Sequence, residues 1–189
     1  IVLGGALLAM PFSAPAGQPP VSFLNALFTS TSAVCVTGLT VVDTSVAFST
    51  LGHVIILTLI QLGGLGIITL SVFFLVVAGR RVSIENRFVM QGVFTAEPAH
   101  DFRNLIVSVL KSTALIEGVG AIILAARFSF DMPLPQALWF GVFHSVSAFC
   151  NAGFALFSDN LMQYRDDPTV SITIMLLIMM GGIGFTVLR

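Results

Sequence analysis

The chain of 189 residues is 56% hydrophobic and only 9% charged, and its mean hydropathy is +1.01. Soluble domains carry about 25% charged residues, so this deficit predicts a surface that mostly faces lipid. The formal net charge of −1 excludes the basic face that nucleic-acid binding requires. The two cysteines form no C-x-x-C metal motif, and neither a Gly-rich phosphate loop nor a Ser/His/Asp set is present. We therefore expect an all-α membrane protein that is not an enzyme and needs no cofactor.

The first part of the chain alternates between apolar runs and short polar segments. Residues 1–12 are apolar, and we expect them to be a piece of a membrane helix that begins upstream. After a proline-rich connector, Ser22 is placed to cap a helix over residues 23–34. At 1.5 Å per residue this helix is about 18 Å long, roughly half of a bilayer core. Gly38 then interrupts the short β-branched segment at 36–40. Residues 43–49 are predicted to be a surface loop.

Two long spans follow, separated by a basic linker. Residues 51–78 are predicted to cross the membrane, with glycines 63, 64 and 66 as packing or bending positions. The linker at 80–104, together with Lys111, holds five of the eight Lys and Arg residues, which places it in the cytoplasm by the positive-inside rule. Residues 105–126 form the next span, 136–149 a second half-length helix, and 169–188 a last span that also continues past the end of the chain.

An internal repeat organises this pattern. Residues 28–38 match residues 143–153 at an offset of 115, and the glycine-rich middle of each following span matches at an offset of 118. The matched pairs in the loops are Phe28/Phe143, Ser30/Ser145, Ser32/Ser147, Ala33/Ala148, Cys35/Cys150 and Gly38/Gly153. Two crossings separate the copies, so the repeats are parallel and both loops enter from the outside. The predicted division is a first repeat at 1–79, a linker at 80–104 and a second repeat at 105–189, with the outer spans truncated.

The chemistry of such loops favours a cation. The C-terminus of a half-helix carries roughly half a negative charge, and several of them pointing at one cavity would hold a positive ion. Backbone carbonyls beyond the helix replace the water of the ion, and glycine permits the required backbone angles. The acidic outer rim is either a funnel that concentrates cations or, as we favour, a set of ordinary solvated loop residues. It comprises Asp43, Asp131, Asp159, Asp166 and Asp167, against Arg127 and Arg165.

Other polar residues have competing interpretations. Glu117 lies deep in a span, either as a hydrogen-bonded structural residue, which we favour, or as part of an ion path. The cysteines at 35 and 150 are predicted to pack behind the loops rather than to bind metal or form a disulfide. The histidines at 53, 100 and 144 lack ligand spacing and are predicted to be structural or solvated.

The stretches Ser-Ala-Val-Cys-Val-Thr-Gly-Leu-Thr at 32–40 and Ser-Ala-Phe-Cys-Asn-Ala-Gly-Phe at 147–154 resemble the pore loops of the Trk/Ktr/HKT cation transporters. The closest resemblance is to the bacterial Ktr/Trk K⁺-translocating membrane subunits. The run Gln-Leu-Gly-Gly-Leu-Gly at 61–66 supports this interpretation. The family has four span–pore-helix–filter–span units around one pore, as in K⁺ channel pore domains, so the chain resembles a fragment with two of the four.

The resemblance implies specific roles. Gly38 and Gly153 would be filter glycines, and the K⁺ ligands would be the carbonyls around them, at Val36, Thr37, Gly38, Asn151, Ala152 and Gly153. In this family a serine in place of a filter glycine is associated with Na⁺ transport. The resemblance also implies a multi-pass protein of the plasma or inner membrane, a homodimer, and a ring of cytoplasmic nucleotide-binding regulatory subunits.

Two other functions are compatible with re-entrant loops. A secondary transporter would couple Na⁺ or H⁺ to a solute, but parallel rather than inverted repeats count against it. A non-transporting membrane enzyme or assembly subunit should show clustered polar groups in the spans, where Glu117 is the main candidate.

Overall fold

The computed structural model describes residues 1–79 and 100–183, with side chains for 1–66 and 107–183. Every regular element in these ranges is helical, so the all-α prediction is confirmed for the described chain. Most of the predicted linker at 80–104 lies outside the described residues. Its last five residues are helical, however, because α6 (His100–Phe128) begins before the predicted boundary.

The first half of the chain folds into helices of very different lengths. In order, the elements are α1 (Val2–Leu8), the 3₁₀ turn η1 (Pro11–Ser13), α2 (Phe23–Val34), α3 (Thr44–Ala47) and α4 (Thr50–Gly79). Helix α2 has the predicted bounds, and Ser22 caps it by accepting a hydrogen bond from the Asn25 N–H at 3.4 Å. Helix α1 is shorter than predicted. Pro11 forces the preceding residue, Met10, into an extended conformation (ψ 151°), which ends the helix.

The surface loop predicted at residues 43–49 is wrong in part. Asp43 accepts a hydrogen bond from the Ser45 N–H at 2.9 Å and starts α3. Thr44 and Phe48 are buried, with 5% and 2% of their surface exposed. The segment is therefore a packed cap over the start of α4.

The second half of the chain repeats this order. It contains α6, α7 (Leu134–Phe149), the 3₁₀ turn η3 (Met162–Tyr164) and α8 (Pro168–Ile183). Helix α7 begins with Leu134 and Pro135. Proline is tolerated in the first turn because the N–H groups there have no partner within the helix. The last predicted span continues into residues 184–189, which lie outside the described residues.

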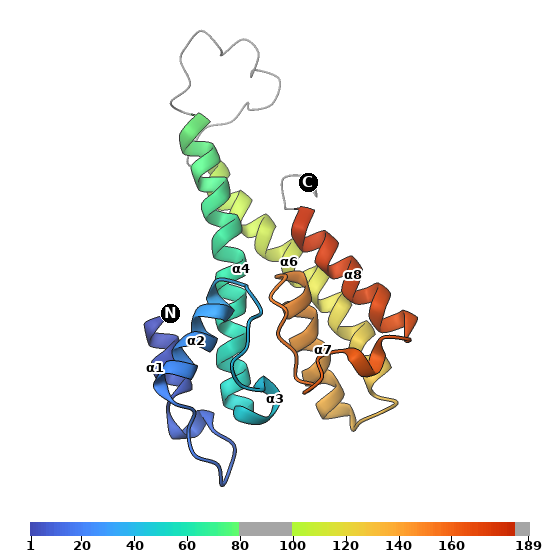
Figure 1. Cartoon of the computed structure of the whole chain (residues 1–189). Helices are drawn as coiled ribbons and strands as arrows, with labels where there is room; N and C mark the ends of the chain where they lie inside the picture. Colours follow the sequence, from blue (N-terminus) through green and yellow to red (C-terminus); the bar gives the residue numbers. More distant parts are fainter. Residues whose placement is uncertain (80–99, 184–189) are drawn as a thin grey trace.

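The helices form two groups of three that meet through α4 and α7. Helices α1, α2 and α4 pack together, as do α6, α7 and α8, and α4 also contacts α7. In Figure 1 the short helices α2 and α7 run in the same direction, and the chain after each returns toward the end of the molecule where α3 lies. The opposite end is where α4 finishes and α6 begins. One buried cluster spans the junction, with Ile56 and Ile60 of α4 beside Phe143 and Val146 of α7.

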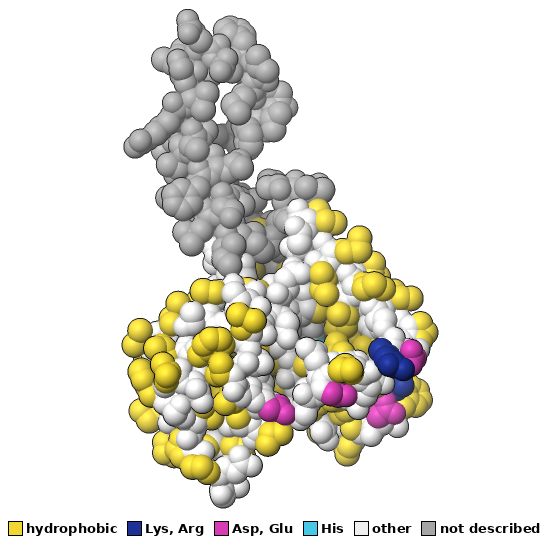
Figure 2. Space-filling model, viewed as in Figure 1, with side chains coloured by type: hydrophobic (Ala, Val, Ile, Leu, Met, Phe, Trp, Pro, Cys, Tyr) yellow, Lys and Arg dark blue, Asp and Glu magenta, His cyan; other side chains and the backbone are white. Residues whose placement is uncertain are grey.

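The surface visible in Figure 2 is rich in apolar side chains. Figure 2 shows hydrophobic side chains across the visible face, while the charged side chains visible there lie near the end that carries α3. Among the described side chains, Val107–Phe128 is the helix long and apolar enough to cross a bilayer, with a mean hydropathy of 1.7. Helix α4 has 30 residues, or about 45 Å at 1.5 Å per residue, which also exceeds the thickness of a bilayer core.

Candidate functional site

The first candidate loop begins where α2 ends. The Val36 N–H donates to the carbonyl of Ala33 at 3.2 Å, and the Thr37 N–H reaches back to the carbonyl of Ser32 at 3.0 Å. These two bonds form a Schellman motif, which requires a left-handed residue after the cap. That residue is Val36, with φ 56°, a conformation that a β-branched side chain strongly disfavours. The motif closes the helix and turns the chain sharply.

The second loop repeats this geometry 115 residues later. The Asn151 N–H donates to the carbonyl of Ala148 at 3.0 Å, and the Ala152 N–H donates to the carbonyl of Ser147 at 2.7 Å. The left-handed residue is Asn151, with φ 60°, and asparagine tolerates this region far better than valine. Two different side chains thus produce the same helix end.

Glycines at matching positions follow each motif. Gly38 has φ 71° and Gly153 has φ 72°, whereas the residue before each glycine is not left-handed. In an ordinary extended strand, successive residues point to opposite sides. The backbone at each glycine, and at the residue two positions before it, therefore departs from the extended conformation.

The two loops meet at their glycines. A Cβ built on Gly38 would lie 2.6 Å from the carbonyl oxygen of Ala152 and 3.2 Å from the Cα of Gly153. A side chain at position 38 is therefore disfavoured for two reasons: the left-handed backbone angle and the closeness of the neighbouring loop. Of the six predicted ligand residues, the structure brings these three into contact.

A cavity of about 170 Å³ lies beside the two helix ends. Val36 and Asn151, the left-handed residues, both line it, whereas Gly38, Ala152 and Gly153 do not. Thr37 does not line it, and its hydroxyl donates to the hydroxyl of Ser32 at 3.0 Å. The remaining lining residues come from α4, α7 and α8: Gly64, Leu65, Phe149, Cys150 and Gly181.

Glycines in α4 and α8 let the short helices approach. A Cβ on Gly63 would lie 2.1 Å from the carbonyl oxygen of Val34, and a Cβ on Gly181 would lie 1.8 Å from that of Phe149. Gly64 faces the sulfur of Cys150 in the same way, at 2.7 Å. The packing role predicted for these glycines is confirmed at the three positions. Among the described residues, none lies within 4 Å of the Cβ position of Gly66, so the structure confirms no packing role there.

The correspondence extends to the first helix of each half, which the sequence comparison missed. The Ser30 hydroxyl donates to the carbonyl of Ile1 at 2.8 Å, and the Ser145 hydroxyl donates to the carbonyl of Glu117 at 2.7 Å. A Cβ on Gly4 would lie 2.5 Å from the Ser30 oxygen, and one on Gly120 would lie 2.6 Å from the Ser145 oxygen. The glycines, 116 residues apart, were the signal that could have revealed this match.

Glu117 connects three helices. Its carboxylate accepts a hydrogen bond from the Gln61 amide at 3.2 Å, and the amide oxygen of Gln61 faces the thiol of Cys150 at 3.9 Å. The side chain is buried, and its Oε1 has no hydrogen-bond partner in the described part of the chain. Glu117 does not line the cavity, which supports the structural interpretation. Both cysteines are free thiols, and Cys35 is exposed, so its predicted packing role is wrong.

Two histidines are structural, as predicted. His53 is bonded to the carbonyl of Thr44 at 2.8 Å and so holds α3 against α4. His144 and Ser147 on α7 both bond the chain that returns from the second loop. The sequence indicated no such role for His144, because its partner is a backbone N–H twelve residues away.

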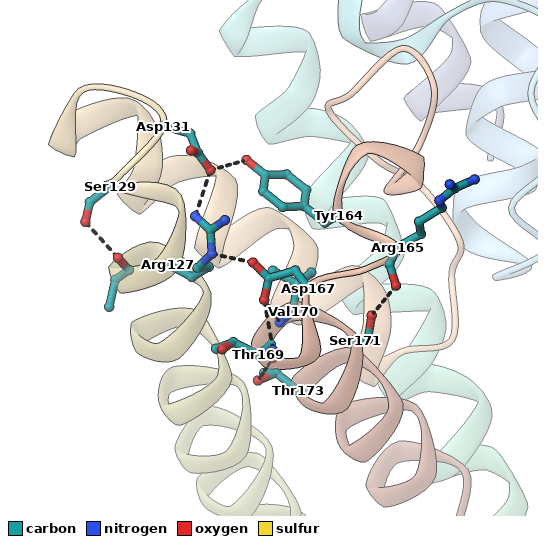
Figure 3. Close-up of polar contacts among 11 residues, drawn as sticks. Arg127, Ser129, Asp131, Tyr164, Arg165, Asp167, Thr169, Val170, Ser171 and Thr173 are labelled. Atoms are coloured by element: carbon teal, nitrogen blue, oxygen red, sulfur yellow. Dashed lines mark hydrogen bonds and ion pairs between the residues drawn. The ribbon is translucent and has the colours of Figure 1, made fainter.

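The acidic rim is largely neutralised. Arg127 pairs with Asp131 at 2.8 Å and with Asp167 (Figure 3). Asp166 pairs with Arg165 at 3.2 Å. Figure 3 also shows the Tyr164 hydroxyl donating to Asp131, a bond of 3.1 Å. Burial, reinforced by that bond, raises the pKa of Tyr164 to about 12. Three of the five aspartates are therefore paired, which supports the interpretation of the rim as ordinary loop residues over that of a cation funnel.

Asp167 also begins α8. Its carboxylate accepts hydrogen bonds from the N–H groups of Thr169 at 2.9 Å and Val170 at 3.2 Å. Desolvation alone would raise the pKa of Asp167, but the Val170 N–H, Arg127 and the Thr169 N–H together hold it below its usual value. The cluster therefore joins the end of α6 to the start of α8.

Comparison with known proteins agrees with this geometry. A family model described as TrkH, cation transport protein, matches residues 8–189. The potassium/sodium uptake protein NtpJ of Enterococcus hirae is 37% identical over the whole chain, which covers 42% of that relative. The Ktr system potassium uptake proteins B of Bacillus subtilis and Vibrio alginolyticus are each 39% identical, over 100% and 96% of this chain and 42% and 39% of the relatives.

The chain thus spans about two fifths of the length of these relatives. The resemblance predicted from the loop motifs is confirmed. Because the family model covers nearly every residue, the chain belongs to the TrkH family of cation transport proteins.

Proposed function

We propose that the protein containing this chain carries K⁺ across a cell membrane, and that the carbonyls of residues 36–38 and 151–153 form part of its selectivity filter. The observation that carries the proposal is the contact between Gly38 and Gly153, each two residues after a left-handed helix cap. Each half then supplies one span–pore-helix–filter–span repeat, the first within 1–79 and the second within 105–189.

The electrostatics of the helix ends support a cation. Helices α2 and α7 run in the same direction, and residues that follow both C-termini line the cavity. Each C-terminus carries a partial negative charge that is little screened in an apolar surrounding. The site within the described chain has no carboxylate among its lining residues, so charge selection rests on the backbone.

K⁺ is favoured over other cations by the ligand type. Backbone carbonyls replace the hydration shell of K⁺ in channel filters. Relatives over the whole chain carry the names potassium uptake protein and potassium/sodium uptake protein. Glycine rather than serine at positions 38 and 153 agrees with the K⁺-selective pattern implied by the family resemblance.

We also propose a topology in which both loops enter from the outside and residues 80–104 lie in the cytoplasm. The arginines at 80, 81, 87 and 103 support this orientation. The homodimer and the ring of nucleotide-binding subunits are proposals that rest on the family resemblance.

The proposal is tested by flux. The complete protein is reconstituted in liposomes, and ⁸⁶Rb⁺ uptake is measured with K⁺ or Na⁺ as competitor. We expect uptake that K⁺ suppresses more strongly than Na⁺, and a loss of that preference in Gly38→Ser and in Gly153→Ser.

Gly17→Ser is the matched control. Gly17 is also left-handed, with φ 83°, but has no neighbour within 4 Å of its Cβ position. The substitution therefore carries a similar backbone cost away from the site. Wild-type preference in both loop variants would contradict the filter assignment, and absence of K⁺-sensitive uptake by the wild type would contradict the function.

A further inference from the structure

The chain that returns from the second loop is bound along one side of α7. Ala152, Phe154 and Leu156 are 0%, 2% and 4% exposed, whereas the intervening Gly153 is exposed. Buried residues thus alternate with more exposed ones, so one side of this segment packs against the molecule.

Ser147 forms two of the hydrogen bonds that hold this returning segment against α7. Its backbone carbonyl accepts the Ala152 N–H at 2.7 Å, and its hydroxyl donates to the carbonyl of Phe154 at 2.7 Å. One bond precedes Gly153 in the chain and the other follows it, so together they fix the backbone of the glycine. Ser147 is itself only 3% exposed.

His144, one turn earlier on α7, forms the third bond. The Leu156 N–H donates to Nε2 of the ring at 3.3 Å. A backbone N–H has no acceptor capacity, so Nε2 must carry a lone pair and the ring is neutral. The proton of the neutral ring is then on Nδ1, which donates to the carbonyl of Phe140 at 2.7 Å. The bonding pattern thus fixes both the charge and the tautomer.

Aromatic side chains hold the ring in this orientation. His144 is 2% exposed and stacks on Phe157, with ring centroids 5.0 Å apart and an angle of 29° between the planes. The rings of Phe128, Phe140 and Phe143 lie 5.8–5.9 Å away. None of these four neighbours carries a charge or competes for Nε2, so the acceptor is reserved for Leu156.

The first half lacks this arrangement. Thr29 occupies the position that corresponds to His144, and its hydroxyl donates to the carbonyl of Asn25 within α2 at 2.9 Å. The counterparts of Phe154 and Leu156 are Leu39 and Val41, which are 62% and 48% exposed. The anchoring by His144 therefore belongs to the second loop alone.

We propose that His144, with Ser147, is a positioning residue for cation selectivity: its neutral ring holds Leu156 and thereby sets the carbonyls of residues 151–153. Neither side chain touches the ion. This inference rests on the proposed function, because it assigns the two residues to the discrimination made by the loop.

Two substitutions of similar size separate positioning from packing. His144→Phe keeps a flat aromatic ring but removes the acceptor. His144→Gln loses the ring but places an amide oxygen where Nε2 lies. In the flux assay of the complete protein, we expect His144→Phe to lose K⁺ preference over Na⁺ by about tenfold, since a buried N–H without a partner destabilises its local geometry. We expect His144→Gln to retain most of the preference.

Ser147→Ala and Thr29→Val complete the design. Ser147→Ala should reduce the preference in the same direction as His144→Phe, whereas Thr29→Val should leave it unchanged. Wild-type preference in His144→Phe, or equal losses in the Phe and Gln variants, would overturn the inference. A wild type without K⁺-sensitive flux would instead contradict the proposed function.

A readout independent of transport is available. The protein is labelled with ¹⁵N-histidine in lipid, and the His144 signals are assigned by their absence in His144→Gln. We expect a protonated Nδ1 and an unprotonated Nε2. A protonated Nε2 would overturn the inference even if the flux results were as expected.

Discussion

The two halves of the chain form the same helix end but differ in how far the residues after it are buried. In the first half, Leu39 and Val41 stand 62% and 48% exposed after the loop. Their counterparts in the second half, Phe154 and Leu156, are 2% and 4% exposed and are bonded to side chains of α7. The loop geometry, including φ near 70° at both glycines, is nonetheless the same.

The outer ends of the halves differ as well. In the first half, serine hydroxyls bond the chain near η1. The Ser13 hydroxyl donates to the carbonyl of Leu7, and the Ser49 hydroxyl donates to that of Phe12, both at 2.8 Å. Arg127 secures the second by pairing with Asp131 and Asp167. The halves are also connected across this end, since the Ser45 and Ser158 hydroxyls lie 2.9 Å apart.

These differences identify what the loop geometry requires. Features found in one half alone, such as the ion pairs and the aromatic rings, are not needed to form the helix end. Features found in both are the Schellman bonds, the left-handed residue, the loop glycine and the close approach of Gly63 or Gly181. Substitutions at the shared features should therefore have the largest effects.

The largest effect is expected for Gly63→Ala and Gly181→Ala. The added methyl group would lie 2.1 Å and 1.8 Å from backbone carbonyl oxygens, which cannot rotate away. We expect each variant to lose about 3 kcal/mol of stability or more. Thermal unfolding monitored by size-exclusion chromatography in detergent measures the loss.

Gly66→Ala is the control in the same helix. No described residue lies within 4 Å of its Cβ position, so alanine should be tolerated and can add up to about 1 kcal/mol through helix propensity. Equal stability of the variants at 63, 66 and 181 would contradict the close approach. A large loss at one of the two glycines alone would break the equivalence of the halves.

Much of this arrangement could be predicted because it depends on local chemistry. The bounds of α2 followed from Ser22 and the proline-rich connector before it, and the loops followed from a repeat of serine, cysteine and glycine. The glycines of α4 and α8 matched at a constant offset, which indicated their common role.

The rest depends on contacts between distant residues. His144 bonds Leu156, and Ser45 meets Ser158, without any periodic pattern that marks them in advance. The aspartates of the outer rim suggested a free acidic surface, because the sequence does not show that Arg127 lies between two of them. Cys35 and Cys150 occupy equivalent positions, yet Cys35 is exposed, whereas Cys150 packs against Gly64 of α4.

A smaller effect is expected from the left-handed residues themselves. Valine at φ 56° stores strain, whereas asparagine at φ 60° stores little. We expect Val36→Asn to stabilise the protein by about 1 kcal/mol and Asn151→Val to destabilise it by a similar amount. Melting temperatures of the two variants and of the double exchange measure this. Destabilisation by Val36→Asn would show that the valine side chain contributes packing that outweighs its strain.

The smallest effect is expected at the outer end, and it depends on pH. The pKa of Asp167 is held below its usual value of 3.8, because the N–H groups of Val170 and Thr169 and the guanidinium of Arg127 outweigh the opposing effect of desolvation. A carboxylate with a lowered pKa contributes stability that is fully present above its unfolded pKa and is lost as the pH falls through the folded value.

We therefore expect Asp167→Asn to lower the melting temperature at neutral pH, and we expect its gap from the wild type to narrow as the pH falls below the usual aspartate value of 3.8. Asp166→Asn is the matched control, because that side chain is 88% exposed and pairs only at the surface with Arg165. Melting curves between pH 3 and pH 7 test the difference. A constant gap between Asp167→Asn and wild type across this range would show that the cap on α8 acts without its charge.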